Sequence, residues 1–274
     1  MSMKNVQSLF AAFGDAVAIV ANVSGGKDST RMLGALCAQF PAAKLYVVMA
    51  DTGFEHVKPI SAEQFARDTA ALLGHDMHVV KNPNKTYLEM VEKRGMFPSA
   101  STRQCTSDLK RVPIEKFIRH LDEKIIINCT GIRAAESPAR AKQTPWKLNT
   151  NLSVAGRVVY NWMPIFNESL KDVLNWHWDN NVPLHPVYVP EYHHDGTQGG
   201  YLRRLSCRVC IFSTKADLRA IYVHDREAFM LVANLEQRIG FTMQSGKSLF
   251  QIIQEEPAGD DKQFGSEEVY PCAA

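Results

Sequence analysis

The sequence predicts an α/β fold, built on a doubly wound, mainly parallel sheet with a helical C-terminal region. Short apolar runs rich in β-branched residues recur along the first half, as expected of parallel strands that are covered on both faces. Amphipathic helical patterns alternate with these runs, and that alternation favours an open parallel sheet. Beyond about residue 165, the apolar spacing is predominantly helical.

Four apolar runs are predicted to be strands, at residues 16–23, 44–50, 77–80 and 124–128. Helices are predicted between them, at residues 28–39, 59–74 and 108–120. Pro59 would lie in the first turn of its helix, where proline is tolerated. Sheets of this kind bind ligands beyond the carboxyl ends of their strands, so the segments that follow each strand are the candidate sites.

The sequence changes character after Gly131, where turn residues become frequent. Later signals are a hairpin within residues 149–160, a helix over 168–178, a loop at 193–200 and two or three helices over 214–254. We therefore expect a nucleotide-binding core at residues 1–165, a helical region at 166–256 packed on the core, and a flexible polar tail at 257–274.

Composition excludes several classes of protein. The 274 residues are 45% hydrophobic and 22% charged, which is ordinary for a globular protein and excludes disordered, collagen-like and coiled-coil chains. The net charge of +2 is too balanced for a protein that coats polyanions, so nucleic acid would need a local basic patch. No apolar run approaches the roughly 20 residues of a membrane span, and no secretory leader is visible. We therefore expect a cytoplasmic protein, in which a close cysteine pair indicates metal, cluster or redox chemistry.

The sharpest motif falls where the first strand ends and the first helix begins. It consists of Ser24, Gly25, Gly26, Lys27, Asp28 and Ser29. The glycines let the backbone approach an anion, and the amide groups and dipole of the helix start attract it. The lysine adds a cation, the serines add hydroxyl donors, and the aspartate caps the helix or helps to hold magnesium. A plain glycine turn with a helix cap is the alternative interpretation.

This motif resembles the signature of the PP-loop ATP pyrophosphatases. Asp51-Thr52-Gly53 is similar to the segment found after the second strand in phosphoadenosine phosphosulfate (PAPS) reductases. The segment from Cys105 to Lys110 and the Gly-x-Arg-x-x-Glu-Ser segment that starts at Gly131 also resemble this superfamily. The resemblance covers about residues 15–215 and implies an adenine nucleotide α-hydrolase-like fold.

The resemblance also implies the residues of the site. Nucleotide contacts are expected from residues 24–29, which we call the phosphate loop, and from Asp51, Thr52, Gly53, Gly131, Arg133, Glu136, Ser137 and Arg140. Catalytic roles are expected for Lys27, Asp28, Lys110 and Arg133. ATP would bind with Mg²⁺, for which Asp28 or Asp51 offers the hard oxygen ligands that this ion prefers. The alternatives are that Asp51 only caps a turn and that the arginines only form ion pairs.

Two branches of the superfamily share these motifs. In sulfonucleotide reductases, a cysteine near the C-terminus attacks the sulfur of PAPS or adenosine phosphosulfate (APS). Cys272 is the only late cysteine here, and it lacks the Glu-Cys-Gly-x-His setting of that branch. The other branch adenylylates a substrate for sulfur insertion, and includes the adenylylating component of DNA phosphorothioation and PAPS reductase-like phage proteins. The Arg103-Gln104-Cys105-Thr106 segment and a later Cys-x-x-Cys match this second branch.

The resemblance implies a metal centre at the cysteines, because cluster-binding members of the family use cysteines in these two segments. Cys207 and Cys210 are spaced so that both thiolates can face one centre, and the resemblance implies Cys105 as the third ligand. A [4Fe–4S] cluster is expected, with its fourth ligand unknown. Zinc, a redox disulfide and plain buried thiols are the alternatives. Cys37 and Cys129 are expected to be packing residues.

The leading hypothesis is therefore an ATP-dependent adenylylating enzyme in sulfur transfer. The resemblance leaves nucleic acid open as the acceptor and a cysteine desulfurase as the sulfur donor. The alternatives are a PAPS or APS reductase that produces sulfite, and a nucleotide-binding regulatory subunit that has lost catalysis.

Overall fold

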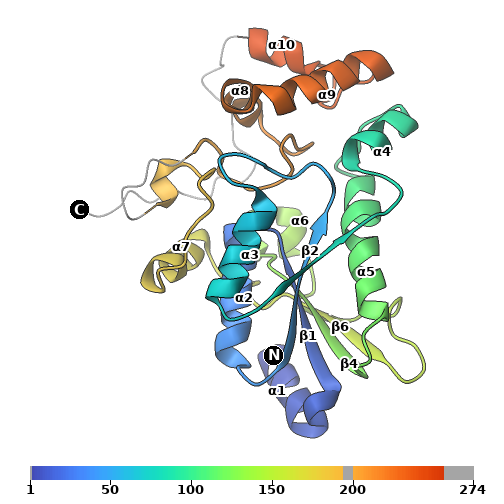
Figure 1. Ribbon diagram of the computed structural model, residues 1–274, viewed down its shortest axis with the longest axis vertical. Helices are drawn as coiled ribbons and strands as arrows, with labels where there is room; N and C mark the ends of the chain where they lie inside the picture. Colours follow the sequence, from blue (N-terminus) through green and yellow to red (C-terminus); the bar gives the residue numbers. More distant parts are fainter. Residues whose placement is uncertain (1, 194–199, 256–274) are drawn as a thin grey trace. The chain divides into compact units, whose positions relative to one another are not determined.

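The first half of the chain forms a six-stranded sheet (Figure 1). The computed structural model describes residues 2–193 and 200–255 of the chain. The strands are β1 (Val17–Val23), β2 (Lys44–Asp51), β3 (Met77–Lys81), β4 (Ile125–Thr130), β5 (Trp146–Leu148) and β6 (Val158–Trp162). Their order across the sheet is β3-β2-β1-β4-β6-β5. β1 pairs in parallel with β2 and β4, and β4 with β6, whereas β5 is antiparallel to β6. The predicted mainly parallel sheet is confirmed.

Helices cover both faces of this sheet, as the doubly wound prediction requires. On one face α5 (Val112–Arg119) packs Ile118 against Val20, Ile126 and Val159. Figure 1 shows α2 (Lys27–Gln39) and α3 (Ala62–Leu72) on the other side of the strands. The chain moves from β1 to β3 in one direction and returns to β4 on the far side of β1. The switch point between β1 and β4 is where such sheets bind ligands.

The chain divides into two compact units, each assembled from separate segments. The first unit contains residues 1–50, 62–80 and 113–185, and the second contains residues 51–61, 81–112 and 186 onward. The first unit carries most of the sheet and α7 (Leu170–Asp179), and the second carries α4 (Tyr87–Arg94) and the late helices. The late helices are α8 (Lys215–His224), α9 (Arg226–Ile239) and α10 (Leu249–Gln254), which agrees with the helical pattern predicted for residues 214–254.

Local sequence explains where several helices start and stop. Reciprocal capping boxes begin four of them, in the pairs Thr86–Glu89 for α4, Ser169–Asp172 for α7, Thr214–Asp217 for α8 and Ser248–Gln251 for α10. Each pair satisfies backbone N–H groups that the helix itself leaves without partners. α4 and α9 end at Gly95 and Gly240, which adopt the left-handed conformation that glycine tolerates.

Some elements differ from the sequence prediction. α3 starts at Ala62, so Pro59 precedes the helix, and the Lys58–Pro59 peptide bond is cis. The helix predicted over 108–120 begins earlier, as a π-helical segment η2 (Cys105–Arg111) that continues into α5. Neither α1 (Ser2–Phe13) nor α4 was predicted, because α1 has no acidic residue in its first turn and α4 is only 8 residues long. The hairpin predicted at residues 149–160 is present as the β5–β6 pair, but its first strand lies earlier, at Trp146–Leu148.

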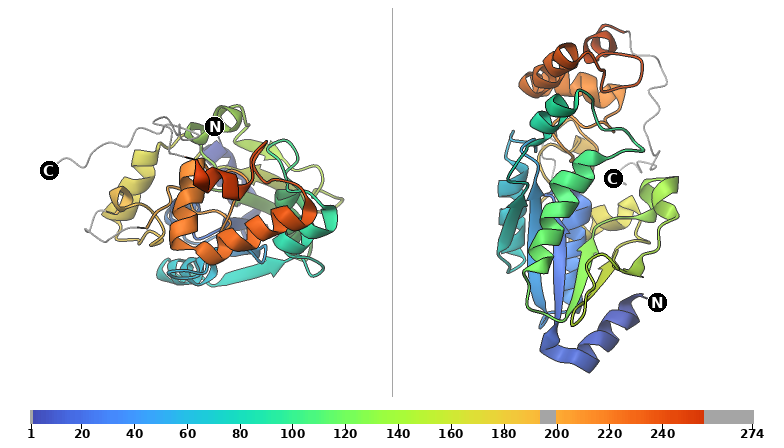
Figure 2. Two further views of the ribbon diagram at one scale, coloured as in Figure 1. Left: turned by 90° about the horizontal axis from the view of Figure 1, so that it is seen from above. Right: turned by 90° about the vertical axis from the view of Figure 1, so that its right-hand side faces the viewer.

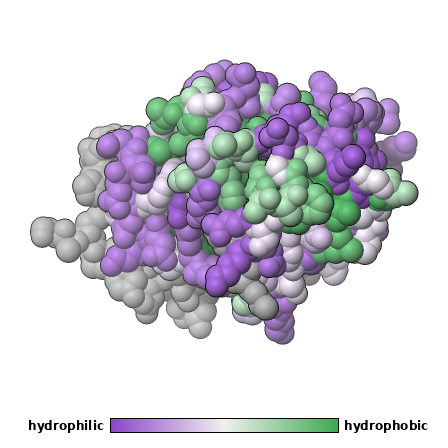
Figure 3. Space-filling model, turned by 90° about the horizontal axis from the view of Figure 1, so that it is seen from below, coloured by the Kyte–Doolittle hydropathy of each residue, from purple (hydrophilic) through white to green (hydrophobic). Residues whose placement is uncertain are grey.

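Short segments complete the described chain. They are η1 (Gly14–Ala16), η3 (Ala134–Glu136), α6 (Pro138–Ala141) and η4 (Pro190–Tyr192). Within the described residues, no helix has both the length and the apolar character that a bilayer span requires. Apolar side chains still reach the surface in places, and Figure 3 shows green apolar atoms among the purple hydrophilic ones on the face seen from below. Figure 2 gives two further views, and its right-hand panel looks onto α5 with the strands behind it.

Candidate functional site

The phosphate loop connects β1 to α2 in the first unit, as the sequence predicts. Gly25 has φ +73°, a conformation that side chains with a Cβ rarely adopt, and this turns the chain from strand to helix. The Ser29 hydroxyl donates to the Gly26 carbonyl at 2.9 Å and accepts from the Ser24 N–H at 3.2 Å. The serine therefore holds the loop around the N-terminus of α2, where the backbone amide groups and the helix dipole favour an anion.

Asp28 links two cations at the start of α2. Its Oδ1 accepts from Arg133 Nε at 2.6 Å, and its Oδ2 accepts from Lys27 Nζ at 3.0 Å. Burial alone would raise the pKa of Asp28, but the charges and hydrogen bonds of Lys27 and Arg133 lower it to about 2. Both carboxylate oxygens are thus engaged in ion pairs, and the buried Arg133, 1% exposed, is held beside the loop.

The segment after β4 approaches the loop closely. A Cβ on Gly131 would lie 2.8 Å from the Asp28 carbonyl oxygen, so only glycine allows this contact. The Arg133 N–H donates to Glu136 Oε2 at 2.9 Å, and Glu136 forms an ion pair with Arg140. Ser137 caps α6 by accepting from the Arg140 N–H. The Gly-x-Arg-x-x-Glu-Ser motif therefore builds one compact turn against the phosphate loop.

α7 supports this arrangement with residues that the sequence analysis missed. His177 Nε2 lies 3.0 Å from the Lys27 carbonyl oxygen, and burial lowers the pKa of His177, which favours its neutral form. Glu168, just before α7, accepts two hydrogen bonds from Arg31 at 2.9 and 2.7 Å. Glutamate and histidine are common residues, and no local pattern in the sequence indicates that Glu168 contacts Arg31 or that His177 contacts Lys27.

The predicted cysteine ligands all belong to the second unit. Cys105 begins η2, and Cys207 pairs with Glu55 in an isolated bridge. Burial raises the pKa of the Cys207 thiol to about 12, although the charge of Lys110 opposes this shift. Burial likewise raises the pKa of Cys105, and the charge of Cys207 raises the pKa of Lys110. Lys110 is therefore the cation that favours the thiolate forms of these cysteines.

The Asp-Thr-Gly segment lies in the same unit as the cysteines. Asp51 Oδ1 accepts from the Gly53 N–H at 2.7 Å, while the Thr52 hydroxyl donates to Glu55 Oε1 at 2.7 Å. Burial raises the pKa of Glu55, and the charge of Lys110 opposes this shift. The sequence analysis missed Glu55, although its position two residues after the motif was a usable signal.

A buried ion pair anchors the loop between the two later cysteines. Arg208 donates from Nε and Nη2 to the two oxygens of Asp225 at 2.9 and 2.7 Å. Asp225 also accepts from the Ala228 N–H at the start of α9.

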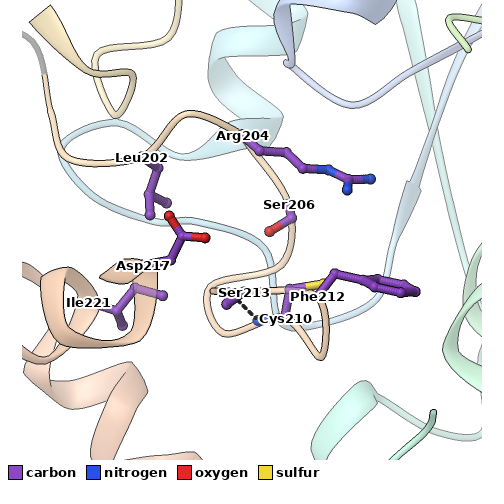
Figure 4. Close-up of a pocket in the computed structure, with 8 residues that line it drawn as sticks. All are labelled: Leu202, Arg204, Ser206, Cys210, Phe212, Ser213, Asp217 and Ile221. Atoms are coloured by element: carbon purple, nitrogen blue, oxygen red, sulfur yellow. Dashed lines mark hydrogen bonds between the residues drawn. The ribbon is translucent and has the colours of Figure 1, made fainter. Parts of the chain in front are cut away.

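A pocket adjoins the loop that carries Cys207 and Cys210, and Figure 4 shows the Cys210 N–H bonded to the Ser213 hydroxyl within it. The residues that line the pocket are Leu202, Arg204, Ser206, Cys210, Phe212, Ser213, Asp217 and Ile221.

Comparison with protein families decides the assignment. The model of the phosphoadenosine phosphosulfate reductase domain matches residues 18–202. The chain belongs to the PAPS reductase domain family. It is 28% identical over 208 residues to an uncharacterized 37.8 kDa protein of Escherichia phage 186, covering 75% of this chain and 57% of that protein. It is 27% identical over 166 residues to the uncharacterized protein MJ0066 of Methanocaldococcus jannaschii, covering 60% of this chain and 32% of that one.

Three solved structures of low identity were found similar to this chain. PAPS reductase from Candida auris, in a phosphate complex, is 14% identical with a TM-score of 0.43, covering 66% of this chain and 80% of that one. The U34-tRNA thiolase NcsA from Methanococcus maripaludis, with its [4Fe-4S] cluster, is 12% identical with a TM-score of 0.48, covering 96% and 88%. NH3-dependent NAD synthetase from Campylobacter jejuni is 14% identical with a TM-score of 0.41, covering 87% and 90%. At these scores, the likeness carries no functional argument.

The residues of this PAPS reductase family chain can be tested against the implied metal centre. Within residues 2–193 and 200–255, no three or more His, Cys, Asp and Glu side chains are grouped so as to hold a metal ion. A single zinc ion would need its sulfur ligands at about 2.3 Å from one point. Cluster thiolates are spaced further apart, because each binds a different iron. Cys105, Cys207 and Cys210 are free, partly buried thiols, and their charges raise the pKa of Lys110.

The other cysteines and histidines fall into place more simply. Cys129 is fully buried in β4 and Cys37 is partly buried in α2, positions consistent with packing. His193 Nε2 lies 3.3 Å from the Tyr188 carbonyl oxygen. His194, Cys272 and the predicted tail lie outside the described residues. The predicted site residues of this PAPS reductase family chain thus form two groups, one in each unit.

Proposed function

We propose that this chain is an enzyme that uses ATP to adenylylate an oxygen of its acceptor, as the activating step of a sulfur transfer. The observation that carries the proposal is the set of Cys105, Cys207 and Cys210 around Lys110 in the second unit. Thiols gathered beside a cation suit sulfur chemistry. The phosphate loop of the first unit supports the nucleotide step.

The nucleotide step would use the cations that Asp28 holds in place. The amide groups at the start of α2 and the Lys27 ammonium would contact the phosphates, with the guanidinium of Arg133 beside them. The acceptor oxygen attacks the α-phosphorus, the bond to the bridging oxygen breaks, and pyrophosphate leaves with the electron pair. The acceptor proton passes to solvent. Catalysis of this kind is mostly positioning and charge stabilisation.

Magnesium would accompany the ATP. Both oxygens of Asp28 are engaged by cations, which makes Asp28 a poorer ligand than Asp51. Asp51 uses one oxygen to accept from the Gly53 N–H and belongs to the second unit. Each unit thus offers one candidate carboxylate for Mg²⁺, Asp28 in the first unit and Asp51 in the second.

The cysteines would hold an iron–sulfur cluster in this chain. Cys105, Cys207 and Cys210 supply three thiolates, and such a cluster can offer an iron atom on which sulfur binds. Lys110 would lower the cost of forming the thiolates. The Arg208–Asp225 ion pair would keep the loop of Cys207 and Cys210 in place, because breaking a buried pair leaves an uncompensated charge.

We extend the proposal to nucleic acid as the acceptor and to a cysteine desulfurase as the sulfur donor. This extension rests on the resemblance of the motif pattern. The matched segments cover only 57% and 32% of the two relatives, so their whole activity does not transfer to this chain. Several basic side chains of the second unit pair with acids, including Arg203 with Glu191 and Lys215 with Glu255. The exposed Arg204 is then a candidate for contacting a phosphate backbone.

The second candidate function is reduction of PAPS or APS, which the description of the matching family favours. The two candidates differ in the nucleotide that they bind. Isothermal calorimetry of anaerobically purified protein with ATP, APS and PAPS, in the presence of Mg²⁺, separates them. We expect preference for ATP, with affinity lost in Lys27→Ala and retained in Lys93→Ala, which removes an exposed lysine of α4. Preference for PAPS or APS would replace the adenylylation proposal with the reductase.

The cysteine assignment is tested by anaerobic analysis of bound iron and acid-labile sulfide. We expect both elements in the wild-type protein and their loss in Cys207→Ala. Cys37→Ala is the matched control, because Cys37 is a partly buried thiol of the first unit. Zinc in place of iron and sulfide would contradict the cluster.

A further inference from the structure

Tyr87 is a buried phenol whose hydroxyl finds no acceptor among the described residues. The residue is only 2% exposed, and its Oη has no hydrogen-bond partner in residues 2–193 and 200–255. Buried polar atoms are nearly always paired, so each exception calls for an explanation, such as a group that the protein binds. A phenylalanine would fill the same space without the unpaired hydroxyl.

The position of the Tyr87 ring is fixed by its neighbours in the second unit. Tyr87 is the first residue of α4, and its N–H donates to the Thr52 carbonyl oxygen at 2.8 Å. Its ring stacks on Phe54, with the ring centroids 5.4 Å apart and an interplanar angle of 14°. The Phe54 carbonyl oxygen accepts from the Arg208 N–H at 3.0 Å, next to Cys207. The phenol is therefore tied to the segment that presents the later cysteine pair.

The three cysteines are the charged groups that act on the pKa of the Tyr87 hydroxyl. Glu55, which follows the stacked Phe54, forms its bridge with Cys207, and α4 contacts η2, which starts at Cys105. Burial and the negative charges of Cys207, Cys210 and Cys105 raise the pKa of Tyr87 well above its usual value of 10. The phenol consequently keeps its proton and is a hydrogen-bond donor at neutral pH.

We propose that Tyr87 is a positioning residue of the three-cysteine site, whose Oη–H donates a hydrogen bond to a sulfur of the group held by Cys105, Cys207 and Cys210. The acceptor is a sulfide of the cluster, because the described cysteine sulfurs give the hydroxyl no hydrogen bond. This inference rests on the cluster of the proposed function, and it assigns a donor to that cluster from an element that contributes no ligand. A hydrogen bond to sulfur stabilises the more negative, reduced state and so raises the reduction potential of a cluster.

The test is Tyr87→Phe, which removes only the hydroxyl. Wild-type protein and the variant are reconstituted anaerobically with iron and sulfide, and the midpoint potential is measured by redox titration. We expect equal iron and sulfide contents and a shift of the midpoint to a more negative potential in the variant. Tyr46→Phe is the matched control, because it removes a hydroxyl that donates to Glu123 at 3.0 Å in the first unit. A merely structural role of Tyr87 would leave the midpoint unchanged.

A second measurement does not depend on the variant folding. Electron–nuclear double resonance on the reduced wild-type cluster, in H₂O and in D₂O, should detect an exchangeable proton close to the cluster. An unchanged midpoint in Tyr87→Phe, or no such proton in the wild type, overturns the role of Tyr87 and leaves the cluster standing. Wild-type protein that takes up neither iron nor sulfide overturns the cluster of the proposed function, and the role of Tyr87 with it.

Discussion

Single residues around Asp28 illustrate how charge shapes the phosphate loop. Lys27 and Arg133 are both cations, and both are largely buried at 6% and 1% exposure. Two buried cations at one helix start would repel each other, and the carboxylate between them removes that cost. The sequence motif predicts the lysine and the aspartate together, but the contact with Arg133 spans 105 positions and depends on the fold.

Asp28 makes stability depend on pH in the acid range. Because its pKa is lowered from 3.8 to about 2, the folded state binds this proton less readily than the unfolded state. The resulting contribution, about 2 kcal/mol, is fully present above pH 4 and is lost as the pH falls towards 2. We expect urea unfolding at a series of pH values to show this loss in the wild type.

The Asp28→Asn variant lacks that titrating group. It should be less stable than the wild type at pH 7, and its stability should fall less steeply between pH 4 and 2. Asp179→Asn, at an exposed position of α7, is the control and should follow the wild-type profile. Parallel profiles for Asp28→Asn and the wild type would show that the ion pairs of Asp28 do not contribute.

At the scale of elements, α7 packs on α2, the helix that follows the phosphate loop. A Cβ placed on Gly34 of α2 would lie 2.0 Å from Cζ2 of Trp176 in α7. The sequence analysis predicted both helices from their apolar spacing. The glycine facing Trp176 could not be foreseen, because the two helices are distant in sequence and meet only in the folded chain.

Gly34→Ala is therefore expected to destabilise the protein, although alanine is favoured over glycine by about 1 kcal/mol in an ordinary helix interior. Overpacking against Trp176 should cost about 1–3 kcal/mol and outweigh that preference. Thermal and urea unfolding measure the change. In a double-mutant cycle, Trp176→Leu should remove the penalty of Gly34→Ala, and additive effects of the two substitutions would contradict the contact.

For the whole molecule, nucleotide binding should be coupled to stability. A ligand present at 100 times its Kd stabilises the folded state by about 2.7 kcal/mol, which for a chain of this size raises Tm by several degrees. We expect this increase with ATP and Mg²⁺ in the wild type and in Lys93→Ala. Lys27→Ala should lose it, and an undiminished increase in that variant would place the phosphates elsewhere.

The sequence by itself determined the fold class, most strands and helices, the family, and the place of the glycine-rich motif between β1 and α2. These features are encoded locally, in apolar periodicity, in the placement of glycines and in motifs. Each of them can be recognised in the sequence without knowledge of any tertiary contact. Even the π-helical start at Cys105 and the unpredicted α4 did not alter the order of strands and motifs.

Only the tertiary structure decided which residues meet. It paired Arg133 with Asp28 and set Lys110 and Glu55 beside the cysteines. It also buried the Tyr87 hydroxyl, which has no partner in the part of the chain that the structure describes. Such contacts join segments that are far apart in the chain, and their energies depend on burial, which strengthens charges and penalises unpaired polar atoms. No local pattern records burial of this kind, so the partners of each motif became visible only when the chain was folded.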